Sequence, residues 1–183
     1  MRVFIGSSGK DGILSIYKEL ASSVATTLAR NNFKLVYGGG DTSMMGTTYL
    51  TYKYEGGKVK GFYDVKDARI AESLELDAVD ISPNTFVRTE HLYEHADLIV
   101  ILPGGIGTLA EFFSMLEEKM TKEDFNKKIV LFNYNKCFDS LLFQIKDLMD
   151  ERFILKETLN MFDIVTNMKD FDKYIEDLVK EEE

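Results

Sequence analysis

Leu98-Ile99-Val100-Ile101-Leu102, followed by Pro103-Gly104-Gly105-Ile106-Gly107-Thr108, is the stretch that decides the fold of this chain. Its first five residues are all apolar, which is typical of a strand buried on both faces of a parallel sheet. Beyond the glycines, Leu109, Phe112 and Leu116 recur at helical spacing. The stretch therefore predicts a strand, a glycine-rich turn and a helix.

The rest of the chain repeats this alternation of strand and helix. Predicted strands cover residues 2–5, 33–37, 59–63, 78–81, 98–102, 129–132 and 163–166, and predicted helices between them include 44–54 and 85–95. Neither an internal repeat nor a linker divides the sequence. The pattern predicts one α/β domain over residues 1–183, built on a single Rossmann-like, doubly wound parallel sheet.

Composition narrows the class of protein. The chain has 183 residues, which suits about one domain. No window holds about 18 consecutive apolar residues, so we expect no membrane association, and the apolar run at the N-terminus is too short for a signal peptide. The single cysteine, Cys137, cannot form an internal disulfide. We therefore expect a cytoplasmic protein.

Charge and histidine content exclude further classes. The net charge is −9, which makes non-specific binding of nucleic acid unfavourable. A small phosphorylated ligand can still bind, because it needs only local N–H groups and one or two cations. His91 and His95 lie one helical turn apart, but without a third ligand nearby they indicate an ordinary polar helix face. We predict neither a metal nor a cofactor.

Three of the predicted strands end in glycine-rich turns. These are Gly6-Ser7-Ser8-Gly9, Gly38-Gly39-Gly40 and the turn that starts at Gly104. Ligands of doubly wound sheets bind beyond the carboxyl ends of the strands, so the turns predict one shared crevice. Glycines at a helix N-terminus favour a phosphate or nucleotide site, with Gly107 expected at positive φ and in close contact with the ligand. The alternative is that the glycines only make tight turns.

The better-known phosphate motifs do not fit these turns. Ala110 and Ser43 stand where the dinucleotide fingerprint has its third glycine, and no Gly-Lys-Ser/Thr follows either turn. Glu111 has two interpretations. The spacing from Thr108 favours a capping box, in which Glu111 bonds back to the Thr108 N–H. Alternatively, its carboxylate faces a ligand in the crevice.

Two segments resemble a known family. They are Val36-Tyr37-Gly38-Gly39-Gly40 with Met45-Gly46, and Pro103–Glu111, which matches Pro-Gly-Gly-x-Gly-Thr-x-x-Glu. Together they resemble the LOG family of cytokinin-activating phosphoribohydrolases, often labelled "possible lysine decarboxylase". The similarity covers nearly the whole chain. Ser43 stands where the family usually has glycine, and Thr89 where Arg88 would be followed by lysine.

The resemblance implies hydrolysis of the N-glycosidic bond of a purine nucleoside 5′-monophosphate. Arg88 and Glu111 would be catalytic, although Arg88 could instead form a surface ion pair. The phosphate would bind at Gly104, Gly105, Ile106, Gly107 and Thr108, and other substrate contacts would come from Gly6, Ser7, Gly39, Gly40 and Met45. The identity of the base stays open.

The same resemblance implies a homodimer. One apolar helix face could form part of the dimer interface or belong to the core. It consists of Phe112, Phe113 and Leu116, with Met115 and Met120. The alternative to an enzyme is a binding protein, such as a molybdenum-cofactor carrier, which shares this fold, or a nucleotide sensor. Decarboxylation by a pyridoxal enzyme is disfavoured, because the glycine turns at 38–40 and 104–107 contain no lysine for a Schiff base.

Overall fold

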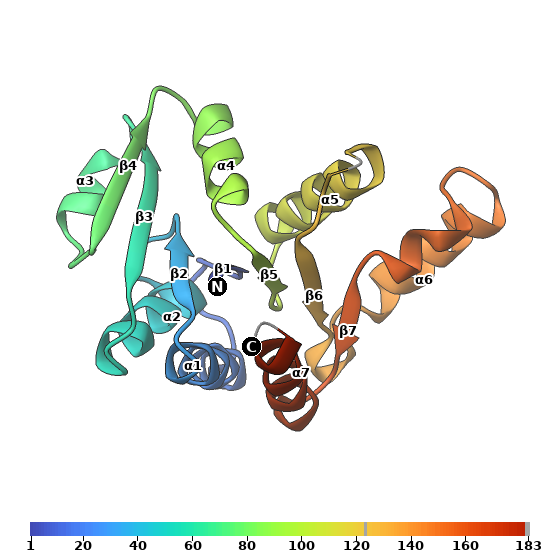
Figure 1. The fold of residues 1–183 in the computed structure, drawn as a ribbon, viewed down its shortest axis with the longest axis horizontal. Helices are drawn as coiled ribbons and strands as arrows, with labels where there is room; N and C mark the ends of the chain where they lie inside the picture. Colours follow the sequence, from blue (N-terminus) through green and yellow to red (C-terminus); the bar gives the residue numbers. More distant parts are fainter. Residues whose placement is uncertain (123, 182–183) are drawn as a thin grey trace.

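A computed structural model of the chain describes residues 1–122 and 124–181. Its strands form one all-parallel sheet in the order β4-β3-β2-β1-β5-β6-β7 (Figure 1). The strands are β1 (Arg2–Gly6), β2 (Lys34–Tyr37), β3 (Val59–Asp64), β4 (Ala78–Ser82), β5 (Leu98–Ile101), β6 (Lys128–Phe132) and β7 (Asp163–Val165). The predicted Rossmann-like parallel sheet is confirmed.

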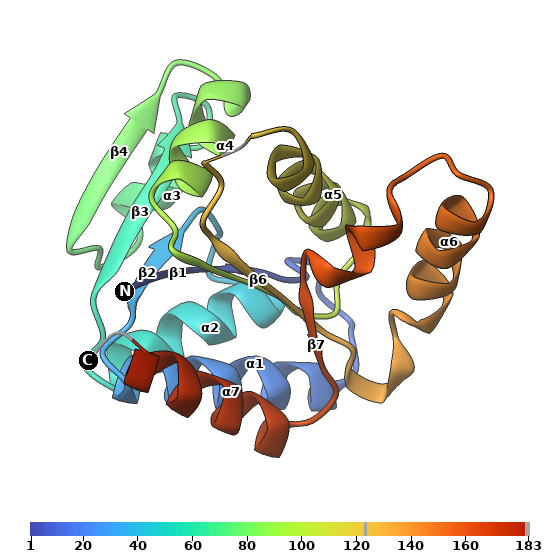
Figure 2. The ribbon, with the colours of Figure 1, turned by 45° about the vertical axis from the view of Figure 1, so that its right-hand side comes forward.

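Helices cover both faces of this sheet. They are α1 (Ser15–Arg30), α2 (Ser43–Tyr54), α3 (Ala68–Glu72), α4 (Thr85–Glu94), α5 (Ile106–Thr121), α6 (Asp139–Asp150) and α7 (Met168–Glu181), with 3-10 turns at Tyr134–Lys136 and Lys156–Asn160. Figure 2 shows α1, α2 and α7 along one face and α4 and α5 along the other. The sheet is therefore doubly wound, as the alternation predicts.

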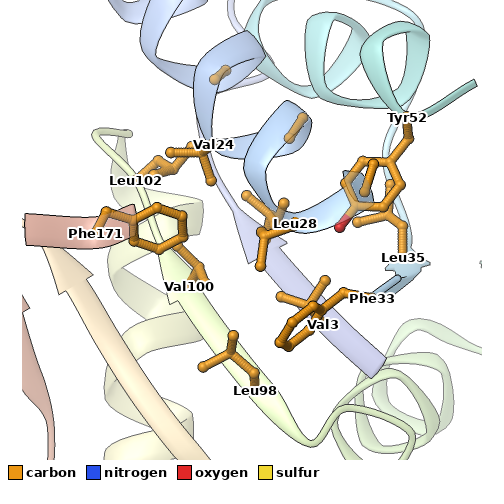
Figure 3. Close-up of a cluster of buried hydrophobic side chains, with 14 of the residues drawn as sticks. Val3, Val24, Leu28, Phe33, Leu35, Tyr52, Leu98, Val100, Leu102 and Phe171 are labelled. Atoms are coloured by element: carbon orange, nitrogen blue, oxygen red, sulfur yellow. The ribbon is translucent and has the colours of Figure 1, made fainter. Parts of the chain in front are cut away.

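The apolar run of β5 explains how the two layers share the sheet. Leu98 and Val100 belong to the core under α1, α2 and α7, and Figure 3 shows Val100 close to Phe171 of α7. Ile99 and Ile101 belong to a second core under α4, α5 and α6. Alternate side chains leave a strand on opposite faces, so an uninterrupted apolar run is what a central strand needs.

The helix after the glycine motif is largely a core element. Phe112, Met115 and Leu116 are almost completely buried, so these residues belong to the core. Phe113 is 42% exposed and points out of the core. The short α3 was not predicted, because its five residues are too few to establish an apolar period.

The order of the strands places the candidate site. From β1 the chain winds through β2 and β3 to β4 at one edge, and from β5 through β6 to β7 at the other. The direction of winding therefore reverses between β1 and β5, where Gly6 pairs with Ile101. Ligands of open α/β sheets bind at this reversal, beyond the carboxyl ends of the strands. Within residues 1–122 and 124–181, no helix is long and apolar enough to span a membrane.

Candidate active site

Hydrogen bonds bring the three glycine turns together at the reversal point. Leu102 N donates to Gly6 O (2.8 Å) and so joins the β5 turn to the β1 turn. Thr42 Oγ1 donates to Gly9 O (3.2 Å) and joins the β1 turn to the loop before α2. The three turns therefore border one region at the carboxyl edge of the sheet, as the sequence predicts.

The β5 turn leads directly into α5. The helix begins at Ile106 with Gly105 as its N-cap residue. A Cβ on Gly104 would overlap the buried Thr108 hydroxyl, so glycine is required at residue 104. In contrast, a Cβ on Gly105 or Gly107 would meet no described atom within 4 Å. The N–H groups in the first turn of α5 have no carbonyl partner within the helix, and such groups favour anions.

Two predictions about this motif are wrong. Gly107 is not among the glycines with positive φ in the described chain, and no neighbour crowds it, because it lies inside the first turn of α5. The capping box does not form either. Since α5 begins at Ile106, Thr108 is already inside the helix, and α5 has no side-chain cap.

Glu111 reaches from α5 to the end of β1. A Cβ on Gly6 would lie 2.9 Å from its Oε2, so the carboxylate packs against the Gly6 backbone. Burial raises the pKa of Glu111 to about 7, and the nearby charge of Arg88 offsets part of that rise. Within the described residues, Glu111 forms no ion pair. A half-buried carboxyl that titrates near neutral pH is suited to proton transfer.

Arg88 extends from α4 to the ends of two strands. Its Nε donates to Phe62 O (3.0 Å), and a terminal nitrogen donates to Gly38 O. No carboxylate lies within ion-pair distance of it in the part of the chain that the structure describes, so the surface ion pair is wrong. Arg88 thus anchors the β2 turn while its charge acts on Glu111.

Two tyrosines complete the anchoring of the β2 turn. Tyr63 Oη donates to Gly39 O (2.8 Å), and Tyr37 Oη donates to Gly40 O. Burial raises the pKa of both phenols well above the ordinary value, so both remain protonated donors. The sequence analysis named Tyr37 in the family motif and placed Tyr63 in a strand, and it gave neither a role in anchoring a turn. Tyr37 stands directly before the glycine turn, which is a local signal, whereas Tyr63 offers none.

Met45 packs between the β1 and β2 turns, and Ser7 is buried within the β1 turn. Ser7 is 6% exposed, and its Oγ has no hydrogen-bond partner among the described residues. A buried hydroxyl without a partner is costly, which is typical of a site that a ligand or water completes. Added Cβ atoms on Gly9 and Gly39 would lie 2.8 Å from Met45 Sδ and 2.6 Å from its Cε.

Ser43 shows how the chain tolerates its departure from the glycine pattern. Its φ is 55°, a left-handed conformation that favours glycine. The Ser43 hydroxyl donates to Lys10 O (2.7 Å) and offsets part of the strain. The glycine usual at this position is thus explained by backbone conformation.

These features place the chain among Rossmann-like α/β proteins, a class whose ligands bind at the reversal of strand order. Residues 45–175 match the family described as "Possible lysine decarboxylase". The chain belongs to this family, the LOG family.

Named relatives and solved structures extend the comparison. The chain is 32% identical over 144 residues to the cytokinin riboside 5′-monophosphate phosphoribohydrolase of Rhodococcoides fascians, covering 78% of this chain and 72% of that protein. It is 28% identical over 177 residues to LOG5 of Arabidopsis thaliana, which carries the same enzyme name, covering 95% and 75%.

Two solved structures share the fold at 16% identity. One is the molybdenum cofactor binding protein from Rippkaea orientalis, with a TM-score of 0.70 over 97% of this chain and 96% of that one. The other is the Moco carrier protein from Chlamydomonas reinhardtii, with a TM-score of 0.72 over 98% of both chains. At this identity the likeness concerns the fold alone.

Proposed function

We propose that this protein hydrolyses the N-glycosidic bond of a purine nucleoside 5′-monophosphate, giving the free base and ribose 5-phosphate. The observation that carries the proposal is the position of Glu111. Its half-buried carboxylate lies at the end of β1, on the same helix whose first-turn N–H groups are suited to a phosphate. The names of relatives that are 26–32% identical support the same reaction.

The proposed reaction is a single displacement at the ribose. The oxygen of a water molecule bonds to C1′, the bond from C1′ to the base nitrogen breaks, and its electron pair leaves with the base. One water proton ends on the base. Positive charge develops on the ribose as the bond breaks, and ionised Glu111 would stabilise it or accept the water proton. Arg88 would favour that ionised form.

In this proposal, several backbone amides together bind the 5′-phosphate. The amides of Gly105, Ile106, Gly107 and Thr108 at the start of α5 would hold the 5′-phosphate, with Gly104 allowing Thr108 to pack close. Ser7 would donate its unpartnered hydroxyl to the ligand. Gly6, Gly39, Gly40 and Met45 would shape the walls of the crevice. Adenine, with or without an N6 substituent, is the base we propose.

We also propose a homodimer. Phe86 at the start of α4 is 89% exposed, Ile106 at the start of α5 is 83% exposed, and Phe113 adds a third apolar side chain. A groove between α4 and α5 connects Phe86 to residues of α5. Covering this surface would remove apolar area from water. Sedimentation of the wild type and of Phe86→Ser distinguishes a dimer from a monomer.

A direct assay separates the enzyme from a binding protein. The protein is incubated with AMP, and free adenine and ribose 5-phosphate are quantified beside a Glu111→Gln control. Equal release of both products by the wild type alone supports the proposal. The shared fold of the Moco carrier keeps a cofactor carrier as the second candidate. Tight binding of the metallopterin without any AMP turnover would favour that carrier.

A further inference from the structure

A cavity of about 370 Å³ lies on the α1 side of the glycine motif. Gly104 and Gly105 form one wall, and Ile13, Tyr17 and Phe138 form apolar walls from neighbouring elements. Lys10 is the one cationic residue in its described lining. The cavity thus joins the open start of α5 to a single positive charge. The sequence analysis did not single out Lys10.

Hydrogen bonds fix the backbone of Lys10 in this position. Its N–H donates to Ser8 Oγ (3.2 Å), and its carbonyl accepts from Ser43 Oγ (2.7 Å). These two bonds hold the loop that carries Lys10 against the start of α2. A flexible lysine stem then starts from a defined point beside the cavity.

The ammonium group of Lys10 has no acidic partner among the described residues. Among residues 1–122 and 124–181, no carboxylate lies within ion-pair distance of its ammonium. Arg88 differs, because two backbone carbonyls already accept from its guanidinium. The exposed ammonium of Lys10 is therefore available to an anionic ligand.

We propose that Lys10 binds the 5′-phosphate and determines the preference for phosphorylated substrates. This inference rests on the proposed function. The N–H groups of α5 supply hydrogen bonds but only partial charge, whereas a phosphate dianion also needs a full positive charge nearby. Lys10 supplies that charge from the cavity side. Ile13 and Phe138 form apolar walls of the cavity beside this exposed charge.

Three variants isolate the charge of Lys10. Lys10→Met removes it with little change in length, and Lys10→Arg restores it. Lys66→Met is the matched control, because Lys66 is also exposed at the carboxyl edge, just after β3, but does not line the cavity. We expect Lys10→Met to lower kcat/KM for AMP by about 10-fold or more, mainly through KM, and to leave adenosine unchanged. Lys10→Arg recovers most of the loss, and Lys66→Met behaves as wild type.

Calorimetric titration with ribose 5-phosphate tests the same inference without turnover. We expect Lys10→Met to weaken this binding at least about 10-fold. If AMP is not cleaved but binding of ribose 5-phosphate depends on Lys10, the inference stands and the proposed function fails. If AMP is cleaved and the AMP-to-adenosine ratio of Lys10→Met equals that of Lys66→Met, the inference is overturned. Wild-type protein that does not bind ribose 5-phosphate overturns it as well.

Discussion

Replacing Glu111 with glutamine should stabilise the folded protein at alkaline pH. Folding raises the pKa of this carboxyl from 4.5 to about 7, because burial disfavours its charged form. The folded state therefore holds the proton more tightly than the unfolded state. Stability is then full below pH 4.5, falls as the pH rises through 7, and stays lower above it.

The size of the effect follows from the two pKa values. The difference between 4.5 and about 7 corresponds to about 3 kcal/mol of lost stability above pH 7. Glutamine cannot ionise, so Glu111→Gln avoids this loss. At pH 8 the variant should be more stable by up to about 3 kcal/mol, which is roughly 6–12 °C in Tm for a domain of this size. Near pH 4.5 the advantage should be largely lost.

Urea unfolding between pH 4.5 and 8 measures this difference. Glu176→Gln is the control, because Glu176 is a helical glutamate that is exposed on α7, and it should stay within about 0.5 kcal/mol of wild type. AMP turnover by Glu111→Gln should fall by about 10² or more. The reasoning is refuted if Glu111→Gln is no more stable at pH 8 than Glu176→Gln. A fully active Glu111→Gln would remove its catalytic role.

Four further predictions concern the glycine turns and Arg88. AMP should be cleaved far better than adenosine, because loss of the phosphate removes several hydrogen bonds of about 1.5–3 kcal/mol each, and a ratio of specificity constants near one would contradict this. Gly107→Ala should leave urea stability unchanged or raise it by up to about 1 kcal/mol, while ribose 5-phosphate binding measured by calorimetry weakens; unchanged binding would move the phosphate elsewhere. Ser43→Ala should be about 1 kcal/mol less stable than Ser43→Gly, since both lack the hydroxyl and only alanine is strained at positive φ; equal urea midpoints would show no strain. Arg88→Met should reduce AMP turnover and raise the pKa of Glu111, which carboxyl NMR titration measures. An unchanged pKa would show that the charge of Arg88 does not act on Glu111.

The parts of the structure that were predictable are those encoded locally. The apolar run of β5 predicted a central strand because alternate residues must be buried on both faces. The start of α5 was not predictable in the same way, since Gly105 and Thr108 are both acceptable N-cap residues and the sequence does not choose between them.

Contacts between distant residues account for the remaining differences. Arg88 donates to a carbonyl fifty positions earlier in the chain, and no local pattern predicts that bond. Tyr63 likewise anchors Gly39 on a neighbouring strand. The role proposed for Lys10 depends on a cavity whose walls come from four separate segments of the chain. Such features become visible only once the topology is known.

The anchoring of Gly38, Gly39 and Gly40 has a consequence for binding thermodynamics. Three consecutive glycines would ordinarily lose much conformational entropy when a ligand orders them, at about 1–2 kcal/mol per residue. Here Arg88, Tyr63 and Tyr37 hold the three carbonyls in the free protein. The ordering is therefore completed during folding, and its entropy cost no longer opposes ligand association. This wall of the crevice is preorganised although it consists of the most flexible residue type.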